Sequence, residues 1–485
     1  MFRRPSQKQQ LVQRVVVSTL AMLAIIIGVT LTVLFILGYR LDSGSGRLEQ
    51  GALLQFDSSP NGADVLTDNV PTGLRTGSKQ TVIAGEHTFT YRKDRYNDWS
   101  RTIDVNAGTL TWLDYARLVP KDLPVEAVQN YASLVGAKAS PDRKAYIIQE
   151  KEDSPVFSLV NLRSENVTST SITLPDNIYD SNTDNPDMAH EFMLRRWDEG
   201  SRYVLLTHHI GSQVEWIVVD TRNVAESKNL TKQLGVQVKD VQFAGTDGRS
   251  FYALMGDGAI RKLDLGNQTI SRALVTDVES FIFSHTTKVL SYVGSDIDDA
   301  TRRVVGIYRD GDASSYVLRS VAKETPLAIA TGLYHGNDYI AIAEGGAVLV
   351  LRGAYPRSVD DVANLTEYST ISLDSPISWL SFSEDGDFLV VKGDVTFVGY
   401  EVEHKRSTIA PIASKADFHW LDKAYVWDDS DGTLKMRDFD GANVSKIMDV
   451  ATGFDATLSQ NGRFFYAIGK EDGGYRLQRV KMILD

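Results

Sequence analysis

An uncharged apolar run near the N-terminus constrains this chain more than any other feature. Residues 15–38 comprise 24 residues without a charged side chain. As an α-helix rising about 1.5 Å per residue, the run is roughly 36 Å long, enough to cross a hydrocarbon core of about 30 Å. A buried core helix is usually shorter and carries a polar face. The run therefore predicts a membrane-spanning helix, and the rest of the chain must lie on one side of that membrane.

The residues flanking this run predict its orientation. Four basic side chains and no acidic one precede the run, whereas basic and acidic side chains balance just after it. Positive charge stays on the cytoplasmic side, so residues 1–14 are expected to be a cytoplasmic tail and the bulk of the chain to lie outside the plasma membrane. A cleaved signal peptide is the alternative, but its apolar region is about 7–15 residues long and ends at small residues. We therefore expect residues 15–38 to be an uncleaved signal anchor of a single-pass membrane protein.

The rest of the chain is acidic and contains no cysteine. After residue 41 it has 46 basic and 63 acidic residues, a net charge of −17. It therefore has no basic surface for nucleic acid, which we exclude as a partner. Without cysteine, disulfides, a thiol nucleophile and a thiolate zinc site are excluded as well. The small polar residues of segment 39–50 predict a short flexible linker.

Short alternating segments between residues 51 and 120 predict a small all-β sandwich. Strands are expected at 52–57, 64–67, 79–83, 86–92, 100–105 and 109–118, with a loop at 70–77. The segment resembles the PEGA domain in three places: a turn reading Pro60-Asn61-Gly62-Ala63, a hairpin reading Ala84-Gly85-Glu86-His87, and a step reading Lys93-Asp94-Arg95-Tyr96 before Trp99. The resemblance implies a structural or adhesive module that faces the cell envelope, and it carries over no catalytic residue.

From residue 121 onward one unit recurs, consisting of a strand, a polar turn and an apolar strand. The turns are clearest at 140–143, 246–249, 383–386 and 459–463, and less regular copies lie between them. A period of about 40–50 residues with four strands per unit is typical of a β-propeller. Helical repeats do not fit, because β-branched and aromatic residues dominate without a 3.6-residue pattern. We count eight units, which start near Tyr131, His190, Asp240, Ser280, Thr331, Ile377, Asp417 and Phe454.

The polar turns resemble the Ser-Pro-Asp-Gly turns of TolB-like and WD40-like propellers, and the TolB-like pattern is the better match. The resemblance implies a β-propeller over residues 121–485. Eight blades are favoured, with seven as the alternative if two weak units share one blade. The last unit shows only three strands, so we expect residues 123–129 to supply the fourth. That exchange would close the ring and remove an open sheet edge.

The loop from Asp180 to Glu191 carries the sharpest local motif. Asp180, Asn182 and Asp184 occupy the first, third and fifth positions, and Glu191 the twelfth, which is the ligand spacing of an EF-hand calcium loop. Asn185 stands where glycine is expected, and no helices are expected beside the loop. A polar loop between two blades is the alternative. Calcium is therefore the one cofactor considered, and no other is expected.

The remaining chemistry-bearing residues predict no catalytic site. His87 is expected to have only a local structural role. His208 and His209 are neighbours on a strand and point to opposite faces, so they cannot chelate one ion. No serine-hydrolase elbow, zinc-protease motif or phosphate loop occurs. Five tryptophans are expected to pack between blades, with a sugar- or peptide-binding face as the alternative: Trp197, Trp216, Trp379, Trp420 and Trp427.

Together these features favour a non-enzymatic, membrane-anchored protein of a bacterial cell envelope. We expect it to bind or scaffold through its propeller, with an envelope protein or a cell-wall polymer as partner. One alternative is an extracytoplasmic hydrolase whose active site lies at the centre of the propeller, because propeller enzymes need no local motif. The other is an envelope sensor. Its cytoplasmic tail is too short to hold a domain, so it would act through a separate membrane partner.

Overall fold

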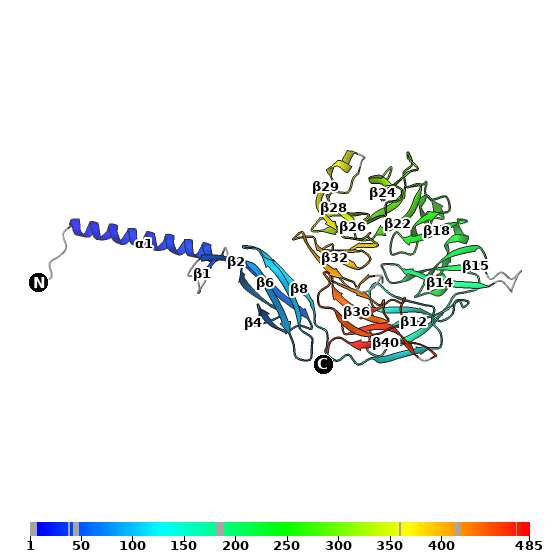
Figure 1. Cartoon of the computed structure of the whole chain (residues 1–485), viewed down its shortest axis with the longest axis horizontal. Helices are drawn as coiled ribbons and strands as arrows, with labels where there is room; N and C mark the ends of the chain where they lie inside the picture. Colours follow the sequence, from blue (N-terminus) through cyan, green and yellow to red (C-terminus); the bar gives the residue numbers. More distant parts are fainter. Residues whose placement is uncertain are drawn as a thin grey trace. The chain divides into compact units, whose positions relative to one another are not determined.

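The computed structural model describes residues 7–36, 39–41, 48–180, 189–357, 360–412, 418–471 and 473–485. The chain forms two compact units, Met1–Asp122 and Leu123–Asp485 (Figure 1). The first contains one long helix and a β-sandwich of two sheets. The second contains eight four-stranded sheets.

The apolar run lies in helix α1 (Gln7–Ile36). Its segment Arg14–Leu34 is long and apolar enough to cross a membrane, and none of it is buried against protein. Thr19, Thr30 and Thr32 satisfy their hydroxyls locally, because each Oγ1 donates to the carbonyl four residues earlier at 2.8–2.9 Å. The helix is thus a candidate single span, although some signal sequences meet the same criteria. Residues 37–38, at the predicted end of the span, lie outside the described residues.

Two four-stranded sheets form the sandwich of the first unit. Their facing sides bury Phe56, Phe89, Tyr91 and Trp99, each no more than 1% exposed. Rings from both sheets touch, with Phe56 and Phe89 centroids 5.5 Å apart. One sheet contains β1 (Tyr39–Leu41), β2 (Leu48–Ser59), β5 (Ser78–Ile83) and β8 (Leu110–Arg117), and the other contains β3 (Asp64–Thr67), β4 (Val70–Arg75), β6 (Gly85–Arg92) and β7 (Trp99–Val105).

Two segments of the first unit differ from the sequence predictions. The loop expected at 70–77 is mostly strand β4, which pairs with β3 at the sheet edge. Pro71 and Gly73 made this segment resemble a loop in the sequence, but an edge strand tolerates both residues. The linker expected at 39–50 is partly strand, because Tyr39 pairs with Gln50 and Leu41 with Leu48. Composition alone did not reveal these backbone pairings.

The second unit is built from eight antiparallel sheets, named here sheet 1 to sheet 8 in chain order. Sheets 1 to 7 are each a meander of four consecutive strands. The first four sheets are β10 (Gly136–Ala139), β11 (Ala145–Gln149), β12 (Val156–Asn161), β13 (Thr168–Thr173); β14 (His190–Trp197), β15 (Tyr203–Ile210), β16 (Gln213–Asp220), β17 (Lys228–Asn229); β18 (Val238–Phe243), β19 (Ser250–Met255), β20 (Ile260–Asp264), β21 (Thr269–Ile270); and β22 (Val278–Ser284), β23 (Val289–Ser295), β24 (Arg302–Arg309), β25 (Tyr316–Ala322).

Sheets 5 to 7 repeat this meander, and sheet 8 adds one strand from elsewhere in the chain. Their strands are β26 (Leu327–Tyr334), β27 (Asn337–Glu344), β28 (Ala347–Gly353), β29 (Thr366–Ser372); β30 (Trp379–Phe382), β31 (Phe388–Lys392), β32 (Thr396–Glu401), β33 (Arg406–Pro411); β34 (His419–Trp420), β35 (Tyr425–Asp428), β36 (Thr433–Asp438), β37 (Ser445–Asp449); and β38 (Thr457–Leu458), β39 (Phe464–Glu471), β40 (Gly474–Lys481) with β9 (Glu126–Tyr131). Short helices occur at α2 (Leu230–Leu234), η1 (Val224–Glu226) and η2 (Asp360–Asn364).

Strand β9 closes the ring of sheets. It pairs with β40, placing Tyr131 opposite Tyr475, so the predicted strand exchange is confirmed, with the strand at Glu126–Tyr131 rather than at residues 123–129. Sheet 8 also contacts sheet 1, because Asp455 accepts a hydrogen bond from Lys138 Nζ at 3.0 Å. Residues of both sheets share one buried cluster, and the red strand β40 lies beside the teal strand β12 (Figure 1). The eight-bladed propeller favoured by the sequence is thereby confirmed.

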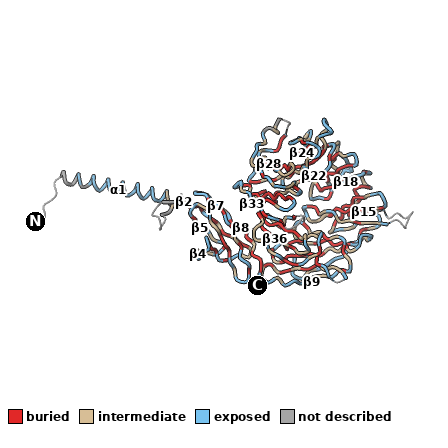
Figure 2. Tube along the Cα trace, in the orientation of Figure 1, coloured by how far each residue is buried: buried red, intermediate tan, exposed pale blue. Residues whose placement is uncertain are grey.

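The second strand of each sheet carries much of the core. In β11, β31 and β35 the central side chains are essentially inaccessible, for example those of Ile147, Leu389 and Val426. Figure 2 shows buried residues along the strands of both units. Sheets that are covered on both faces have continuous apolar strands rather than alternating ones. This explains why the recurring unit appears in the sequence as an apolar run after each polar turn.

Candidate functional site

A buried polar side chain fixes the turn between the first two strands in several sheets. Ser140, Ser383 and Ser459 fill this position in sheets 1, 6 and 8, and each is at most 4% exposed. Each Oγ accepts a hydrogen bond from the N–H five residues later, at 2.9–3.1 Å. Each also donates to the Asp or Asn two residues later, at 2.7–2.8 Å. In sheet 2, Asp198 replaces the serine and accepts from the N–H groups four and five residues later.

The residue after this buried side chain lies beside a cavity in four of the sheets. Since the turn is fixed by buried hydrogen bonds, the position of that residue is fixed as well. Pro141, Glu199, Glu384 and Gln460 all follow such a side chain, and all four line cavities. The cavities collect turns from sheets far apart in the sequence and form the candidate site.

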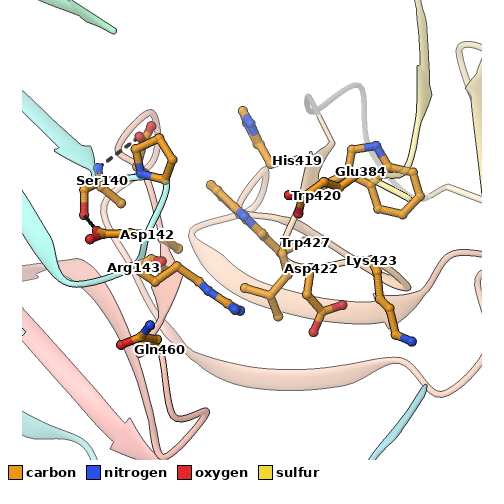
Figure 3. A pocket seen from close by; sticks show the side chains of 16 residues that line it. Ser140, Asp142, Arg143, Glu384, His419, Trp420, Asp422, Lys423, Trp427 and Gln460 are labelled. Atoms are coloured by element: carbon orange, nitrogen blue, oxygen red, sulfur yellow. Dashed lines mark hydrogen bonds between the residues drawn. The ribbon is translucent and has the colours of Figure 1, made fainter. Parts of the chain in front are cut away.

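The larger cavity has a volume of about 630 Å³ and lies among sheets 1, 6, 7 and 8. Figure 3 shows Asp142, Arg143 and Gln460 on one side of it. Across the space lie Glu384, Trp420, Asp422, Lys423 and Trp427. With Asp455, four carboxylates line the cavity against two basic side chains.

Several carboxylates around this cavity are already engaged with the protein. Burial alone would raise the pKa of Asp142, but hydrogen bonds from Ser140 and Lys144 lower it overall. Asp455 is paired with Lys138 on the neighbouring sheet. Glu384 differs from these two, because its exposed side chain lies in the cavity. It is therefore the carboxylate that is best placed to meet a ligand.

Aromatic rings form one wall of the larger cavity. His419 stacks on Trp427 with ring centroids 4.4 Å apart and planes 20° apart. The indole Nε1 of Trp420 donates to Ser381 Oγ at 3.1 Å. These contacts hold the rings in place beside the carboxylates. Fixed aromatic faces next to negative charge suit a ligand that carries both a cation and an apolar surface.

A second cavity of about 300 Å³ shares Glu384 with the first and is lined by sheets 2, 4, 5 and 6. Glu199 enters it from the turn of sheet 2. Although Glu199 reaches solvent, desolvation by the surrounding protein raises its pKa, and repulsion from Glu384 and Asp198 adds to this rise. Lys288 acts in the opposite direction. Turns from two distant sheets therefore concentrate negative charge at the centre of the ring.

An apolar space adjoins the second cavity. It has a volume of about 200 Å³ and is lined largely by the first strands of sheets 4, 5 and 6. Ile282, Ile329 and Leu380 line both spaces. Trp379, which was expected to pack between blades, lines this third cavity. The second cavity is thus acidic at Glu199 and Glu384, and the space that adjoins it is largely apolar.

The predicted calcium loop stays a prediction. Asn182 and Asp184 lie outside the described residues. The N–H of Asp180 donates to Glu215 Oε2 at 3.0 Å, and Glu191 lies in β14 opposite His209. Within the described part of the chain, no cluster of three or more His, Asp or Glu side chains suits a metal ion.

His208 and His209 occupy different environments, as expected for neighbours on a strand. His208 is fully buried and joins two partners from neighbouring strands. Its Nδ1 lies 2.9 Å from Glu215 Oε2, and its Nε2 lies 2.9 Å from His190 Nδ1. The sequence analysis missed this polar trio, because its members come from three strands.

His87 has the local role that the sequence predicted. Its Nδ1 lies 2.7 Å from Asp68 Oδ2, and its Nε2 lies 2.9 Å from the Ile83 carbonyl oxygen. A backbone hydrogen bond from Thr88 and the contact with His87 lower the pKa of Asp68. Both ring nitrogens are thus occupied inside the sandwich.

The tryptophans divide between core and cavity. Trp197 and Trp216 are buried, as expected for packing between blades. Trp420 and Trp427 line the larger cavity instead, although Trp427 is only 4% exposed. Sequence reasoning also missed the roles of Glu199 and Glu384. The sequence did contain one signal for them: both directly follow the polar residue that comes after the first strand of a sheet.

Comparisons with known proteins agree with this architecture. Residues 52–120 match the model of the PEGA domain, so the sandwich is a PEGA domain. A search of curated proteins finds no match to the chain.

Solved structures resemble the chain only in fold. Dihydro-heme d1 dehydrogenase NirN is 15% identical with a TM-score of 0.42, over 65% of this chain and 67% of that one. Kluyveromyces lactis Hsv2 is 13% identical with a TM-score of 0.39, over 73% and 100%. The β-propeller domain of Myceliophteria thermophila Cps50 (Swd1) is 12% identical with a TM-score of 0.38, over 73% and 99%. Similarity at this level says nothing about a ligand or an activity.

Proposed function

We propose that this chain is a single-pass, membrane-anchored binding protein of the cell envelope. Its propeller lies outside the membrane and binds an amine-bearing ligand at the centre of the ring. The ligand belongs to an envelope protein or a cell-wall polymer, and binding involves no chemical step. The carrying observation is the cavity of about 630 Å³, where Glu384 and three further carboxylates meet fixed aromatic rings.

The chemistry of the cavity supports a cationic ligand. Glu384 has an exposed carboxylate that lines both cavities, and Glu199 in the second cavity lies near enough for the two charges to repel. A positive charge placed between them would relieve that repulsion and form charge-assisted hydrogen bonds. Trp420 could cover the apolar part of the same ligand. A protein and a polymer can both supply an amine, so the two sources need separate probes.

The direct test is binding of cationic oligomers by the full chain in lipid nanodiscs. Pentalysine represents the protein source and a glucosamine oligomer represents the polymer source. N-acetylated pentaglutamate and the N-acetylated glucosamine oligomer lack the positive charge and are the ligand controls. We expect one cationic probe to bind, with affinity falling as salt screens the charges. Glu384→Gln should weaken binding about tenfold, the effect of losing roughly 1.4 kcal/mol of a charge-assisted hydrogen bond.

Glu324→Gln is the matched control variant. Glu324 is exposed between β25 and β26, a connection at the opposite end of the sheet from the cavity turns. It should leave the affinity unchanged. Binding that is equally weakened by both variants, or no binding of either cationic probe, would contradict the proposal.

The second candidate is an extracytoplasmic hydrolase, which the raised pKa of Glu199 favours. A raised pKa favours the protonated form of Glu199, which a general acid needs, and Glu384 would supply the partner carboxylate. Turnover of peptide or glycan substrates that disappears in both Glu199→Gln and Glu384→Gln would support the hydrolase. Binding without turnover would leave the binding protein as the function.

A further inference from the structure

One face of the PEGA sandwich exposes an apolar patch. On the sheet formed by β5, β2 and β8, four large apolar side chains are 40–51% exposed: Leu53, Ile83, Leu110 and Trp112. The strand register places them together, because Leu53 pairs with Leu110 and Gly51 with Ile83. The residues alternating with them, such as Leu54 and Val82, face the sandwich core. This group of four is called the sheet patch below.

Chain connectivity keeps the sheet patch near the end of helix α1. The helix ends at Ile36 and β1 begins at Tyr39, so their Cα atoms are at most about 11 Å apart over three steps of about 3.8 Å. Tyr39 pairs with Gln50, one residue before Gly51 on β2. Further along β2, Leu53 lies three residues from Gln50, or about 10 Å at the usual strand rise. With about 5 Å across the Tyr39–Gln50 pair, Leu53 therefore lies within roughly 27 Å of the helix end, whatever the orientation of the helix.

The residues along the sheet follow an order that suits a lipid surface. Ile83, Leu53 and Leu110 lie at the level of the sheet nearest the helix. Trp112 follows two residues later, and Lys79 Nζ lies 5.9 Å from the centroid of its ring. Exposed Asp114 comes two residues further on. The sheet thus presents apolar side chains first, then an amphipathic ring beside a cation, and then a carboxylate. This is the order expected along a protein surface that runs outward from a bilayer with anionic headgroups.

We infer that the sheet patch docks the PEGA domain onto the lipid bilayer that helix α1 spans. The inference rests on the membrane anchoring in the proposed function and adds a second contact with the same membrane. Leu53, Ile83 and Leu110 enter the interface, Trp112 lies at headgroup level, and Lys79 meets anionic lipid. The helix makes this weak contact effective, because the tether keeps the sandwich at high local concentration beside the bilayer.

The test uses the absence of cysteine from the chain. A single Leu110→Cys substitution in the full chain gives a unique site for an environment-sensitive fluorophore. The labelled protein is reconstituted in nanodiscs of phosphatidylcholine and phosphatidylglycerol that contain spin-labelled lipid. Val70→Cys is the matched control, since Val70 is 64% exposed on the other sheet. Thr81→Cys, which lies opposite Leu53, provides a second label on the patch if Leu110→Cys unfolds.

We expect lipid-borne quencher to reduce the fluorescence at position 110 and to leave position 70 unchanged. A label at Leu23→Cys, within the helix, reports whether the span is inserted. If the label at position 23 is quenched but the labels at positions 110 and 70 are quenched equally weakly, the docking is wrong and the membrane anchor stands. No quenching at 23 would overturn the anchor and the docking together. Protection of position 110 from both lipid and aqueous quenchers would show that protein covers the patch, and would also overturn the inference.

Discussion

Glu199 and Glu384 show how the chain builds a charged site without a local motif. Each follows a buried polar side chain, Asp198 or Ser383, whose hydrogen bonds fix the turn. The sequence predicts the turn at 383–386, because Ser, Asp and Gly favour such turns. It does not predict that this turn meets Glu199, because that approach depends on the number of sheets and on the closure of the ring. The sequence therefore indicated the turn that holds Glu384, but it indicated neither Glu199 nor the approach of the two residues.

Replacing Glu199 should stabilise the protein at neutral pH. Its pKa is raised in the folded state, so ionisation favours the unfolded chain as the pH rises through that pKa. Glu199→Gln removes this penalty. We expect a gain of up to about 1 kcal/mol at pH 7, a small value because the side chain is exposed and solvent screens its charge.

The same comparison at acidic pH provides the control. Below the unfolded pKa of glutamate, about 4.3, both forms carry a neutral side chain, so the difference between Glu199→Gln and the parent should disappear. Denaturant unfolding at pH 7 and pH 3.5 measures both values. Equal stability at pH 7, or a gain that persists at pH 3.5, would show that the charge at Glu199 is not the cause.

Among the elements, the strands that were predicted and those that were missed differ in burial. Strands such as β11 and β31 follow a polar turn and are apolar up to their last residue, so the sequence marks both their start and their type. Strand β4 and the beginning of β2 carry polar or turn-forming residues, and only their backbone pairing identifies them. Strand β9 was predicted by counting, because the last unit lacked one strand.

Truncation of one buried residue should show whether β9 belongs to sheet 8. Tyr131 is 4% exposed in the cluster shared by sheets 1 and 8, so Tyr131→Ala should cost about 3–5 kcal/mol. Asn130→Ala, the exposed neighbour on the same strand, should stay within about 0.5 kcal/mol of the parent. Denaturant unfolding of the propeller measures both. Similar, small changes for the two variants would mean that β9 does not complete the ring.

At the scale of the whole molecule, the sequence predicted the order of the parts better than their functions. Residues 7–36 form a helix, residues 52–120 match the PEGA domain, and eight sheets follow. These parts are specified by local patterns: an uncharged run, short alternating strands and a recurring turn. The cavity is not, because its lining comes from sheets 1, 6, 7 and 8 and exists only after the ring has closed.

The most direct measurement of the proposed function is carbodiimide coupling of a cationic oligomer to the full chain in nanodiscs, with the modified carboxylates mapped by mass spectrometry. A bound amine should couple to Glu384 and Glu199, and high salt or unlabelled oligomer should suppress the coupling. Glu324 should remain at background. Coupling spread evenly over exposed carboxylates, with Glu324 as reactive as Glu384, would contradict ligand binding at the centre of the propeller.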